Sequence, residues 1–410
     1  LYMKQKIPYQ AFIPLVLFLF FMGCKERRQT ENISASVKMK SEPVNQKWSE
    51  QMAQSIMTRH PESYQIEDRD TPKWGYTHGL VLNAFLQLYK ETGDETYYNY
   101  VKGYLDELIN ADGSIKTYPF EDYNIDKINP GKLLFTFYEK TKEEKYLKAM
   151  QLLRKQLEEH PRTSQGGFWH KKRYPSQMWL DGLYMGAPYY AQYAVTYGDA
   201  ENLADVAKQF ELIQEHAIDP ETKLLYHGWD ESKEQKWANP VTGVSPNFWS
   251  RSLGWYAMAL VDVLDYFPED HPKRALLISY LNQLVEALIP FQHESGLWYQ
   301  VPTMGDKEGN YLEASGSAMF AYAIAKGVNK RYLDTYFKTV ANKAFDGLTQ
   351  KLIKRNDDGT ITLTQVCAVA GLGGDPYRDG SYEYYVNERI QTNDPKGTGA
   401  FIMAALQLGR

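Results

Sequence analysis

The sequence predicts an all-α fold, an (α/α)6 barrel in which six outer helices enclose six inner helices. Charged amphipathic segments and nearly wholly apolar segments alternate along the chain from about residue 45, six of each kind. A helix with one apolar stripe lies at a surface, whereas a helix that is apolar all round is buried. The turns that follow the charged segments also recur, and each leads into the next apolar segment.

The charged segments are the predicted outer helices. In residues 143–159, Tyr146, Met150, Leu153 and Leu157 recur at helical spacing, with Lys, Glu and Arg between them. This spacing produces one apolar stripe on an otherwise polar helix. The six predicted outer helices are 45–59, 94–110, 143–159, 199–216, 271–291 and 331–350.

The apolar segments are the predicted inner helices. They are rich in Gly, Ala and aromatic residues, a composition typical of helices buried on most sides. The six predicted inner helices are 75–91, 130–140, 177–197, 248–266, 314–327 and 397–408.

Short extended pieces are predicted in the loops between outer and inner helices. Each follows a Gly or another turn residue, and the five pieces are 112–115, 166–169, 223–226, 295–298 and 358–361. Since each leads into an inner helix, we expect all of them at one end of the barrel. Long loops on a rigid scaffold are where functional sites are usually built.

Composition excludes several classes of function. The 410 residues contain 46 Lys+Arg against 51 Asp+Glu, which leaves no basic excess for nucleic acid. The 32 Tyr and 9 Trp offer flat apolar faces with hydrogen-bonding edges, which suit contact with sugars.

His-Glu-x-x-His, a nucleophile elbow, a Walker loop and G-x-G-x-x-G are all absent from the sequence, so we expect no cofactor and no bound metal. No heptad repeat marks an oligomer interface.

Residues 1–24 are predicted to be a signal peptide. Lys4 and Lys6 precede an apolar run, 11–22, that is too short to span a bilayer. The run ends in a sequence that resembles a bacterial lipoprotein cleavage box, with Cys24 as the lipidated residue; simple secretion is the alternative. We therefore expect a bacterial cell-envelope protein, lipid-anchored or periplasmic, that meets the membrane only through this anchor. Residues 25–44 are polar and predicted as a flexible tether, and 45–410 as one catalytic domain.

Asp181 is the first catalytic candidate. It lies early in an almost wholly apolar inner helix, where a carboxylate loses hydration and its protonated form is favoured. Such a group suits proton donation near neutral pH. The alternative is a buried aspartate that caps or tethers a loop.

Asp126 is the second carboxylate. It comes just before another inner helix, in which Pro130 fits the first turn. Two carboxylates that share a cavity tend to differ in protonation, one holding a proton and one staying ionised. Alternatively, Asp126 or Asn129 is simply a helix N-cap.

An arginine and two histidines complete the candidates. Arg251 and Trp255 are four residues apart, so they share a helix face and offer a cation beside an aromatic ring. His170 and His227 lie on extended pieces and could bind a polar substrate group or share a proton with a carboxylate. The alternatives are a structural arginine paired with an aspartate and ordinary loop histidines.

Five motifs in this order resemble glycoside hydrolase family 105, the unsaturated rhamnogalacturonyl hydrolases, and the related unsaturated glucuronyl hydrolases. The motifs are NIDKINPG at 124–131, WHK at 169–171, MWLDGLYM at 178–185, YHGW at 226–229 and WSRSLGW at 249–255. The resemblance covers about residues 45 to 408 and implies the same barrel.

The resemblance also implies the reaction. These enzymes remove the 4,5-unsaturated uronic acid from the non-reducing end of a lyase-generated oligosaccharide by hydrating its double bond. By similarity, Asp181 protonates C4 and then takes a proton from the water that adds to C5, and Asp126 is the partner carboxylate. The implied substrate-binding residues are His170, Trp179, Met185, His227, Trp249, Arg251 and Trp255, with Tyr76 and His78 added without a motif of comparable length.

Family members differ in whether they accept unsaturated galacturonic acid on rhamnose, as in pectin, or unsaturated glucuronic acid on other sugars, as in ulvan. Without the resemblance, the residues are also compatible with three other functions: a conventional inverting glycosidase, a sugar epimerase and a non-enzymatic glycan-binding lipoprotein.

Overall fold

Helices dominate residues 46–198 and 200–410, which the computed structural model describes, and the strands there are at most three residues long. The predicted helical class is therefore confirmed. None of the described helices has both the length and the apolar character needed to cross a membrane. The predicted signal peptide (1–24), the lipidation of Cys24 and the tether (25–44) lie outside the described residues and stay predictions.

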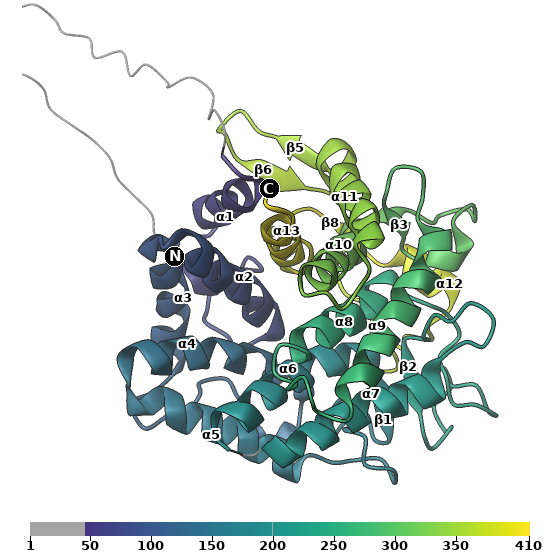
Figure 1. The fold of residues 1–410 in the computed structure, drawn as a ribbon, viewed down its shortest axis with the longest axis horizontal. Helices are drawn as coiled ribbons and strands as arrows, with labels where there is room; N and C mark the ends of the chain where they lie inside the picture. The colour runs from purple at the N-terminus through teal and green to yellow at the C-terminus, as the bar shows by residue number, and fades with distance from the viewer. Residues whose placement is uncertain (1–45, 199) are drawn as a thin grey trace, which may run out of the picture. The chain divides into compact units, whose positions relative to one another are not determined.

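Six helices contact one another in a closed ring (Figure 1). Each packs against the next in chain order, and the last packs against the first. These inner helices are α2 (Tyr76–Thr92), α4 (Lys132–Thr141), α6 (Leu180–Thr196), α8 (Ser250–Val263), α10 (Ala314–Asn329) and α13 (Pro395–Leu408). Their burial follows from composition, since most of them are apolar on every side.

A second set of six helices packs outside this ring, each mainly against one inner helix. They are α1 (Trp48–Arg59), α3 (Glu95–Leu108), α5 (Glu144–Glu159), α7 (Leu203–Ala217), α9 (Arg274–Leu288) and α11 (Lys338–Gly347). Helix α1 lies on α13, and α3 to α11 lie in order on α2 to α10. The alternation of charged and apolar segments thus corresponds to an outer and an inner ring.

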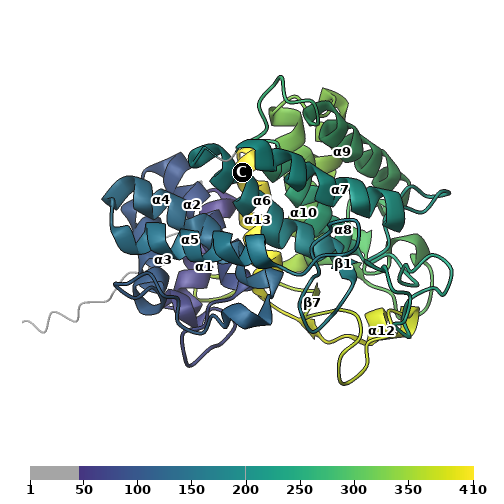
Figure 2. The same cartoon turned by 90° about the horizontal axis from the view of Figure 1, so that it is seen from below.

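Four two-stranded antiparallel sheets occur in the described part of the chain. The pairs are β1 (Gln177–Trp179) with β2 (Gly228–Asp230), β3 (Trp298–Tyr299) with β4 (Leu312–Glu313), β5 (Ile353–Arg355) with β6 (Ile361–Leu363), and β7 (Val366–Cys367) with β8 (Ile390–Gln391). Strands β1 and β4 run directly into the inner helices α6 and α10. Figure 2 shows β7 and α12 at one end of the ring and the C-terminus at the other.

Two boundaries and one additional helix differ clearly from the prediction. Residues 177–179 form β1 rather than helix, because their backbone pairs with β2, about fifty residues away in sequence. In 331–350 the α-helix begins only at Lys338, after a 3-10 turn capped by the Asp334 side chain. A short helix that the sequence did not predict, α12 (Tyr382–Asn387), is capped by Ser381 and is too short to show a periodic pattern.

Glycine allows the inner helices to approach closely. A Cβ atom on Gly79 of α2 would lie 2.8 Å from the backbone nitrogen of Pro130, which leads into α4. A Cβ atom on Gly316 of α10 would lie 2.8 Å from the Cβ of Ser250, where α8 begins. Both contacts are closer than real Cβ atoms tolerate, so a larger residue would push the ring apart.

We expect Gly79→Ala to lower the free energy of unfolding by about 1–3 kcal/mol through overpacking of this contact. Urea unfolding measures the loss. Gly103→Ala on α3 is the control, since its Cβ would meet only the Ser63 Oγ at 3.4 Å. The control should be neutral or stabilising by up to about 1 kcal/mol. Equal stability of the two variants would contradict this account of the ring.

Candidate active site

Backbone hydrogen bonds tie together the loops that carry the candidate residues. The Ile125 N–H donates to the His170 carbonyl at 3.2 Å, and the His170 N–H donates to the Gln177 carbonyl at 2.7 Å. At the start of α6, the Leu180 N–H donates to the His227 carbonyl at 3.0 Å. Three loops far apart in sequence are thereby held side by side, and each brings one or two polar side chains to the same end of the ring.

Asp181 lies in the first turn of α6 beside His227. Its Oδ2 is 3.1 Å from His227 Nε2, and the aspartate side chain is 13% exposed while the histidine is fully buried. His227 Nδ1 lies 2.7 Å from the Tyr385 hydroxyl. Burial raises the pKa of Tyr385 well above its ordinary value, so this hydroxyl is protonated and can donate to Nδ1. Donation to Nδ1 leaves the ring proton on Nε2, which lies beside Asp181 Oδ2 without forming a hydrogen bond to it.

Asp126 lies beside a cation. Lys171 Nζ is 2.6 Å from its Oδ2, and His170 Nε2 is 3.3 Å from its Oδ1. Burial alone would raise the pKa of Asp126, but the Lys171 ammonium and, to a smaller extent, His170 hold it below the ordinary value. Asp126 is therefore ionised. Neither Asp126 nor Asn129 caps the inner helix, because the N-cap of α4 is Gly131 without a side-chain hydrogen bond, and Asn129 donates to the Tyr76 carbonyl instead.

Trp179 lies between the two histidines. Its ring stacks on His170 with centroids 4.3 Å apart and contacts His227 edge-on at 5.5 Å. Burial lowers the pKa of His170 to about 4, although the negative charges of Asp126 and Asp181 oppose this shift. His170 is therefore neutral at physiological pH, and the charges of both carboxylates affect it.

Trp249 extends this aromatic group on the side of Tyr385. Its indole N–H donates to Gln300 Oε1 at 3.0 Å, and its ring lies 4.9 Å from His227 and 6.0 Å from Tyr385. The Gln300 amide in turn donates to the Tyr385 carbonyl at 3.0 Å. Trp249 and Gln300 thus hold the histidine and the tyrosine in place.

Arg251 is buried and bound to protein groups. Its guanidinium donates to Ser315 Oγ at 3.2 Å, to the Ala368 carbonyl at 3.3 Å and to the Cys367 carbonyl. It lies over the Trp249 ring at 4.7 Å. The aspartate partner considered for a structural arginine is replaced by a hydroxyl and two carbonyls. Arg251 therefore joins α8 to the segment after β7.

Trp255 and Tyr76 pack together. The Trp255 ring stacks on Tyr184 at 4.9 Å and meets Tyr76 at 6.3 Å. Tyr76 is partly exposed at the start of α2. Burial raises the pKa of Tyr76 well above its ordinary value, so its phenol is neutral.

The Met185 and His78 side chains are buried in the protein interior. Met185 is 1% exposed within the main apolar core. The His78 Nε2 donates to the Tyr64 carbonyl at 3.1 Å, and its ring stacks on Tyr104 at 4.8 Å. Both side chains are engaged in packing.

Two polar partners were missed by the sequence analysis. Lys171 directly follows His170 within a quoted motif, so a lysine beside a candidate histidine was a usable signal. Tyr385 carried no local signal, because it lies on the short helix α12, 158 residues from His227 in sequence.

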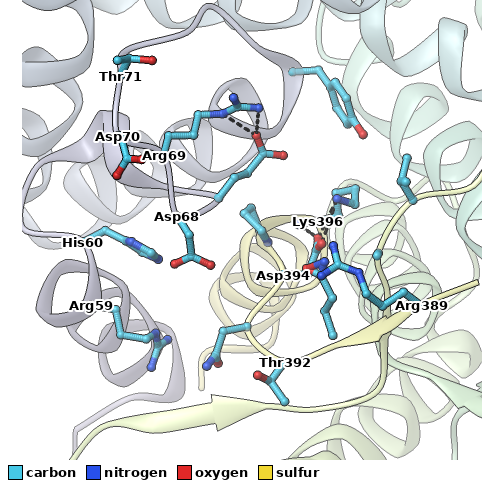
Figure 3. Close-up of a pocket in the computed structure, with 17 residues that line it drawn as sticks. Arg59, His60, Asp68, Arg69, Asp70, Thr71, Arg389, Thr392, Asp394 and Lys396 are labelled. Atoms are coloured by element: carbon cyan, nitrogen blue, oxygen red, sulfur yellow. Dashed lines mark hydrogen bonds and ion pairs between the residues drawn. The ribbon is translucent and has the colours of Figure 1, made fainter.

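A cavity of about 830 Å³ opens next to Tyr76 (Figure 3). The connection between α1 and α2 lines one side, and the segment that leads into α13 lines the other. Ala368, which binds Arg251, also lines it, so the cavity adjoins the candidate site without reaching Asp126 or Asp181. Charges of both signs surround the cavity: Arg59, Arg69, Arg389 and Lys396 with Glu67, Asp68, Asp70 and Asp394.

This cavity offers both donors and acceptors to a ligand. Arg69 pairs with Glu67 at 2.6 Å, and Lys396 pairs with Asp394 at 2.9 Å. Arg389 makes no ion pair within the described residues. Such a surface suits a ligand rich in hydroxyl groups. Nowhere in the described chain are three or more His, Cys, Asp or Glu side chains grouped to hold a metal ion.

Comparison with known proteins finds relatives over most of this chain. The model of Glycosyl Hydrolase Family 88 matches residues 48–410. A solved family 105 glycoside hydrolase from C. acetobutylicum ATCC 824 is 45% identical with a TM-score of 0.85, and the match covers 89% of this chain and 99% of that one. Protein Atu3128 of Agrobacterium fabrum is 38% identical over 54% of this chain and 96% of its own. An unsaturated rhamnogalacturonyl hydrolase of Bacillus subtilis is 27% identical over 61% of this chain and 70% of its own.

We expect Lys171→Met to destabilise the fold by about 3 kcal/mol at neutral pH, because it leaves the buried Asp126 carboxylate without its cation. The pKa of Asp126 is lower in the folded protein than in the unfolded chain. Its charge pair with Lys171 therefore stabilises the fold above the unfolded-state pKa, and this stabilisation is lost as pH falls through the folded-state pKa. The difference from wild type should therefore shrink on acidification. Urea unfolding across a pH series measures it.

Lys172→Met is the matched control, since the exposed Lys172 side chain meets the Glu121 carbonyl and the Tyr123 ring and pairs with no carboxylate among the described residues. It should change stability by less than about 0.5 kcal/mol at every pH. A Lys171→Met deficit that does not vary with pH would rule out the assigned charge pair.

Proposed function

The chain belongs to glycosyl hydrolase family 88, and from this premise we propose that it removes a 4,5-unsaturated uronic acid from the non-reducing end of lyase-generated oligosaccharides by hydrating the C4=C5 double bond. The observation that supports this most is the difference between the two carboxylates. Asp126 is held ionised by a lysine, whereas Asp181 lies beside a histidine and pairs with no lysine or arginine among the described residues. One permanent anion and one group free to give up a proton suit this chemistry.

In the proposed reaction, Asp181 is the general acid and then the general base. Its Oδ2 is buried against His227, so Oδ1 is the oxygen that delivers the proton. The proton goes to C4, where the electron pair of the double bond forms the new C–H bond, and positive charge develops at C5 and the ring oxygen. A water then bonds to C5 while Asp181 takes its proton. The resulting hemiketal opens and releases the remaining sugar.

His227 and Tyr385 stabilise the charge that forms on Asp181. As the proton leaves Oδ1, negative charge spreads to Oδ2, which is 3.1 Å from the His227 Nε2. With Tyr385 donating to Nδ1, the ring proton is on Nε2 beside that oxygen, although the two atoms form no hydrogen bond in the structure. In this proposal the bond forms as negative charge develops on Oδ2, and it lowers the barrier by stabilising that charge.

Asp126 supplies the lasting negative charge. It favours the positive charge that develops on the sugar ring. Its Oδ1 lies 3.3 Å from His170 Nε2, so the histidine is held beside the same anion. In this proposal Asp126 also accepts hydrogen bonds from the ring hydroxyls.

The rest of the oligosaccharide lies in the 830 Å³ cavity beside Tyr76 in this proposal. Charged donors and acceptors there meet the hydroxyl groups of the sugars that follow the unsaturated one. The B. subtilis relative is named as an unsaturated rhamnogalacturonyl hydrolase, which favours a pectin-type substrate first, with ulvan-type glucuronyl substrates as the second class.

We expect Asp181→Asn to lower the rate of hydration by at least about 10³-fold, because the amide has no proton to give or take. The assay follows loss of the ultraviolet absorbance of the conjugated uronate, with lyase-treated pectin and ulvan oligosaccharides. Asp270→Asn, at an exposed position far from α6 in sequence, is the control and should match wild type.

Each result of this assay discriminates between functions. Absorbance that persists on both substrates while saturated glycosides are cleaved would replace hydration with a conventional glycosidase. An isomerised sugar with no cleavage would indicate an epimerase. Sugar binding without turnover in both wild type and Asp181→Asn would indicate a binding protein.

We expect Tyr385→Phe to reduce kcat by roughly 3- to 10-fold with little change in KM, since one lost hydrogen bond is worth about 0.5–1.5 kcal/mol. Without the tyrosine proton, the ring proton of His227 is no longer held on Nε2, the nitrogen beside Asp181. The limb of the pH–rate profile that reports the catalytic acid should then move to higher pH. Tyr384→Phe loses a bond to the Gly371 N–H instead and should leave the profile in place. An unchanged profile in Tyr385→Phe would remove Tyr385 from the mechanism.

A further inference from the structure

A second polar cavity lies inside the ring at the end away from Asp181. Its volume is about 260 Å³, and we call it the floor cavity. It is lined from α6 by Gln192, eleven residues after Asp181 and so about 16 Å further along the helix. Asp262 near the end of α8 and Lys326 near the end of α10 also line it. The proposed reaction uses none of these groups.

We propose that the floor cavity binds a small oxyanion, such as a carboxylate, sulfate or phosphate ion, and that the Lys132 ammonium is the main group that holds it.

Lys132 is the observation that carries this proposal. The residue begins α4 and is 8% exposed, and its Nζ has no hydrogen-bond or ion-pair partner within the described residues. Nζ lies 3.9 Å above the centre of the Tyr184 ring, whose hydroxyl is also buried without a partner. A cation over a ring recovers only part of the hydration that an ammonium loses on burial. Buried donors in native proteins are nearly always satisfied, so this pair indicates a ligand.

The acids around the cavity are committed to other lysines. Lys326 Nζ lies 2.7 Å from Asp262 and 2.6 Å from Asp265, and Lys330 lies 3.4 Å from Asp265. The Tyr322 hydroxyl donates to Asp262 at 2.7 Å. Among the described residues, neither aspartate is within ion-pair distance of Lys132.

The charge of the lining also favours an anion. Four lysines and two aspartates line the floor cavity, with Lys90 of α2 as the fourth lysine. The lining therefore carries an excess of positive charge whenever Lys132 is protonated. Such an excess in a partly enclosed space attracts anions.

Protonation of Lys132 should couple to anion binding. Burial lowers the pKa of Lys132 to about 7, an effect that Asp262 opposes and Lys326 strengthens. The other charged or titratable groups that line the cavity or neighbour Lys132 are Lys90, Tyr184, Asp265, Tyr266, Tyr322 and Lys330. An anion at Nζ favours the ammonium, so affinity should fall as pH rises above the pKa of Lys132.

The volume limits the ligand to a small ion. Pockets for drug-sized molecules occupy about 300–1,000 Å³, and the floor cavity is smaller than that range. An oligosaccharide is excluded by size, which separates this site from the proposed active site. The anion site and the proposed hydration reaction are therefore tested separately, and failure of one would leave the other standing.

Sulfate is the probe, because it stays fully ionised across the range in which Lys132 titrates. Calorimetric titration with sulfate, at constant ionic strength set by chloride, compares wild type with Lys132→Met. Methionine has a similar length and packs well on an aromatic ring, so it should retain the fold. Lys338→Met, at an exposed position outside the cavity, is the matched control.

We expect wild type and Lys338→Met to bind sulfate saturably, more tightly at pH below 7 than above, and Lys132→Met to bind at least about tenfold more weakly, since a hydrogen bond to a charged group is worth that much. Absence of saturable binding to wild type would overturn the proposal. Equal affinity of Lys132→Met would overturn it as well.

A second measurement applies if Lys132→Met does not fold. An amine-reactive reagent is added to wild type, and the modification of the peptide that contains Lys132 is followed by mass spectrometry. Sulfate should slow modification of Lys132 and leave that of Lys338 unchanged. Equal rates at Lys132 with and without sulfate would overturn the proposal.

Discussion

The candidate site depends on the backbone hydrogen bonds that join three loops at one end of the helical ring. The bonds from Ile125 to His170, from His170 to Gln177 and from Leu180 to His227 connect segments up to about a hundred residues apart. Each bond also satisfies a buried backbone group that would otherwise destabilise the loop. Because the side chains next to these bonds are the polar ones, the same few bonds set the positions of the carboxylates and the histidines.

Burial of charge distinguishes the two ends of the ring. At the loop end, Asp126 keeps its charge because Lys171 lies against it, whereas Asp181 faces a histidine. At the opposite end, Lys326 is neutralised by two aspartates and Lys132 is not. A buried charge is stable only with a partner, so an unmatched group marks a place where proton transfer or binding is to be expected.

Helices were predictable in kind and order, but several local features were not. Periodicity reports which face of a helix is apolar, and this is a property of residues close together in sequence. Residues 177–179 have a helical pattern and yet form a strand, because the backbone of β2 pairs with them. Arg251 was grouped with Trp255 by helical spacing, but its guanidinium turns to Trp249 and to carbonyls of the segment after β7.

By itself, the sequence determined the alternation of outer and inner helices and the candidate carboxylates and histidines, because amphipathic patterns and motifs are local. Only the tertiary structure decided which partner each polar group has. It placed Lys171 on Asp126 and Tyr385 on His227, and it left Lys132 with only an aromatic ring. Protonation and binding depend on such partners, and the partners come from distant parts of the chain that no local pattern connects.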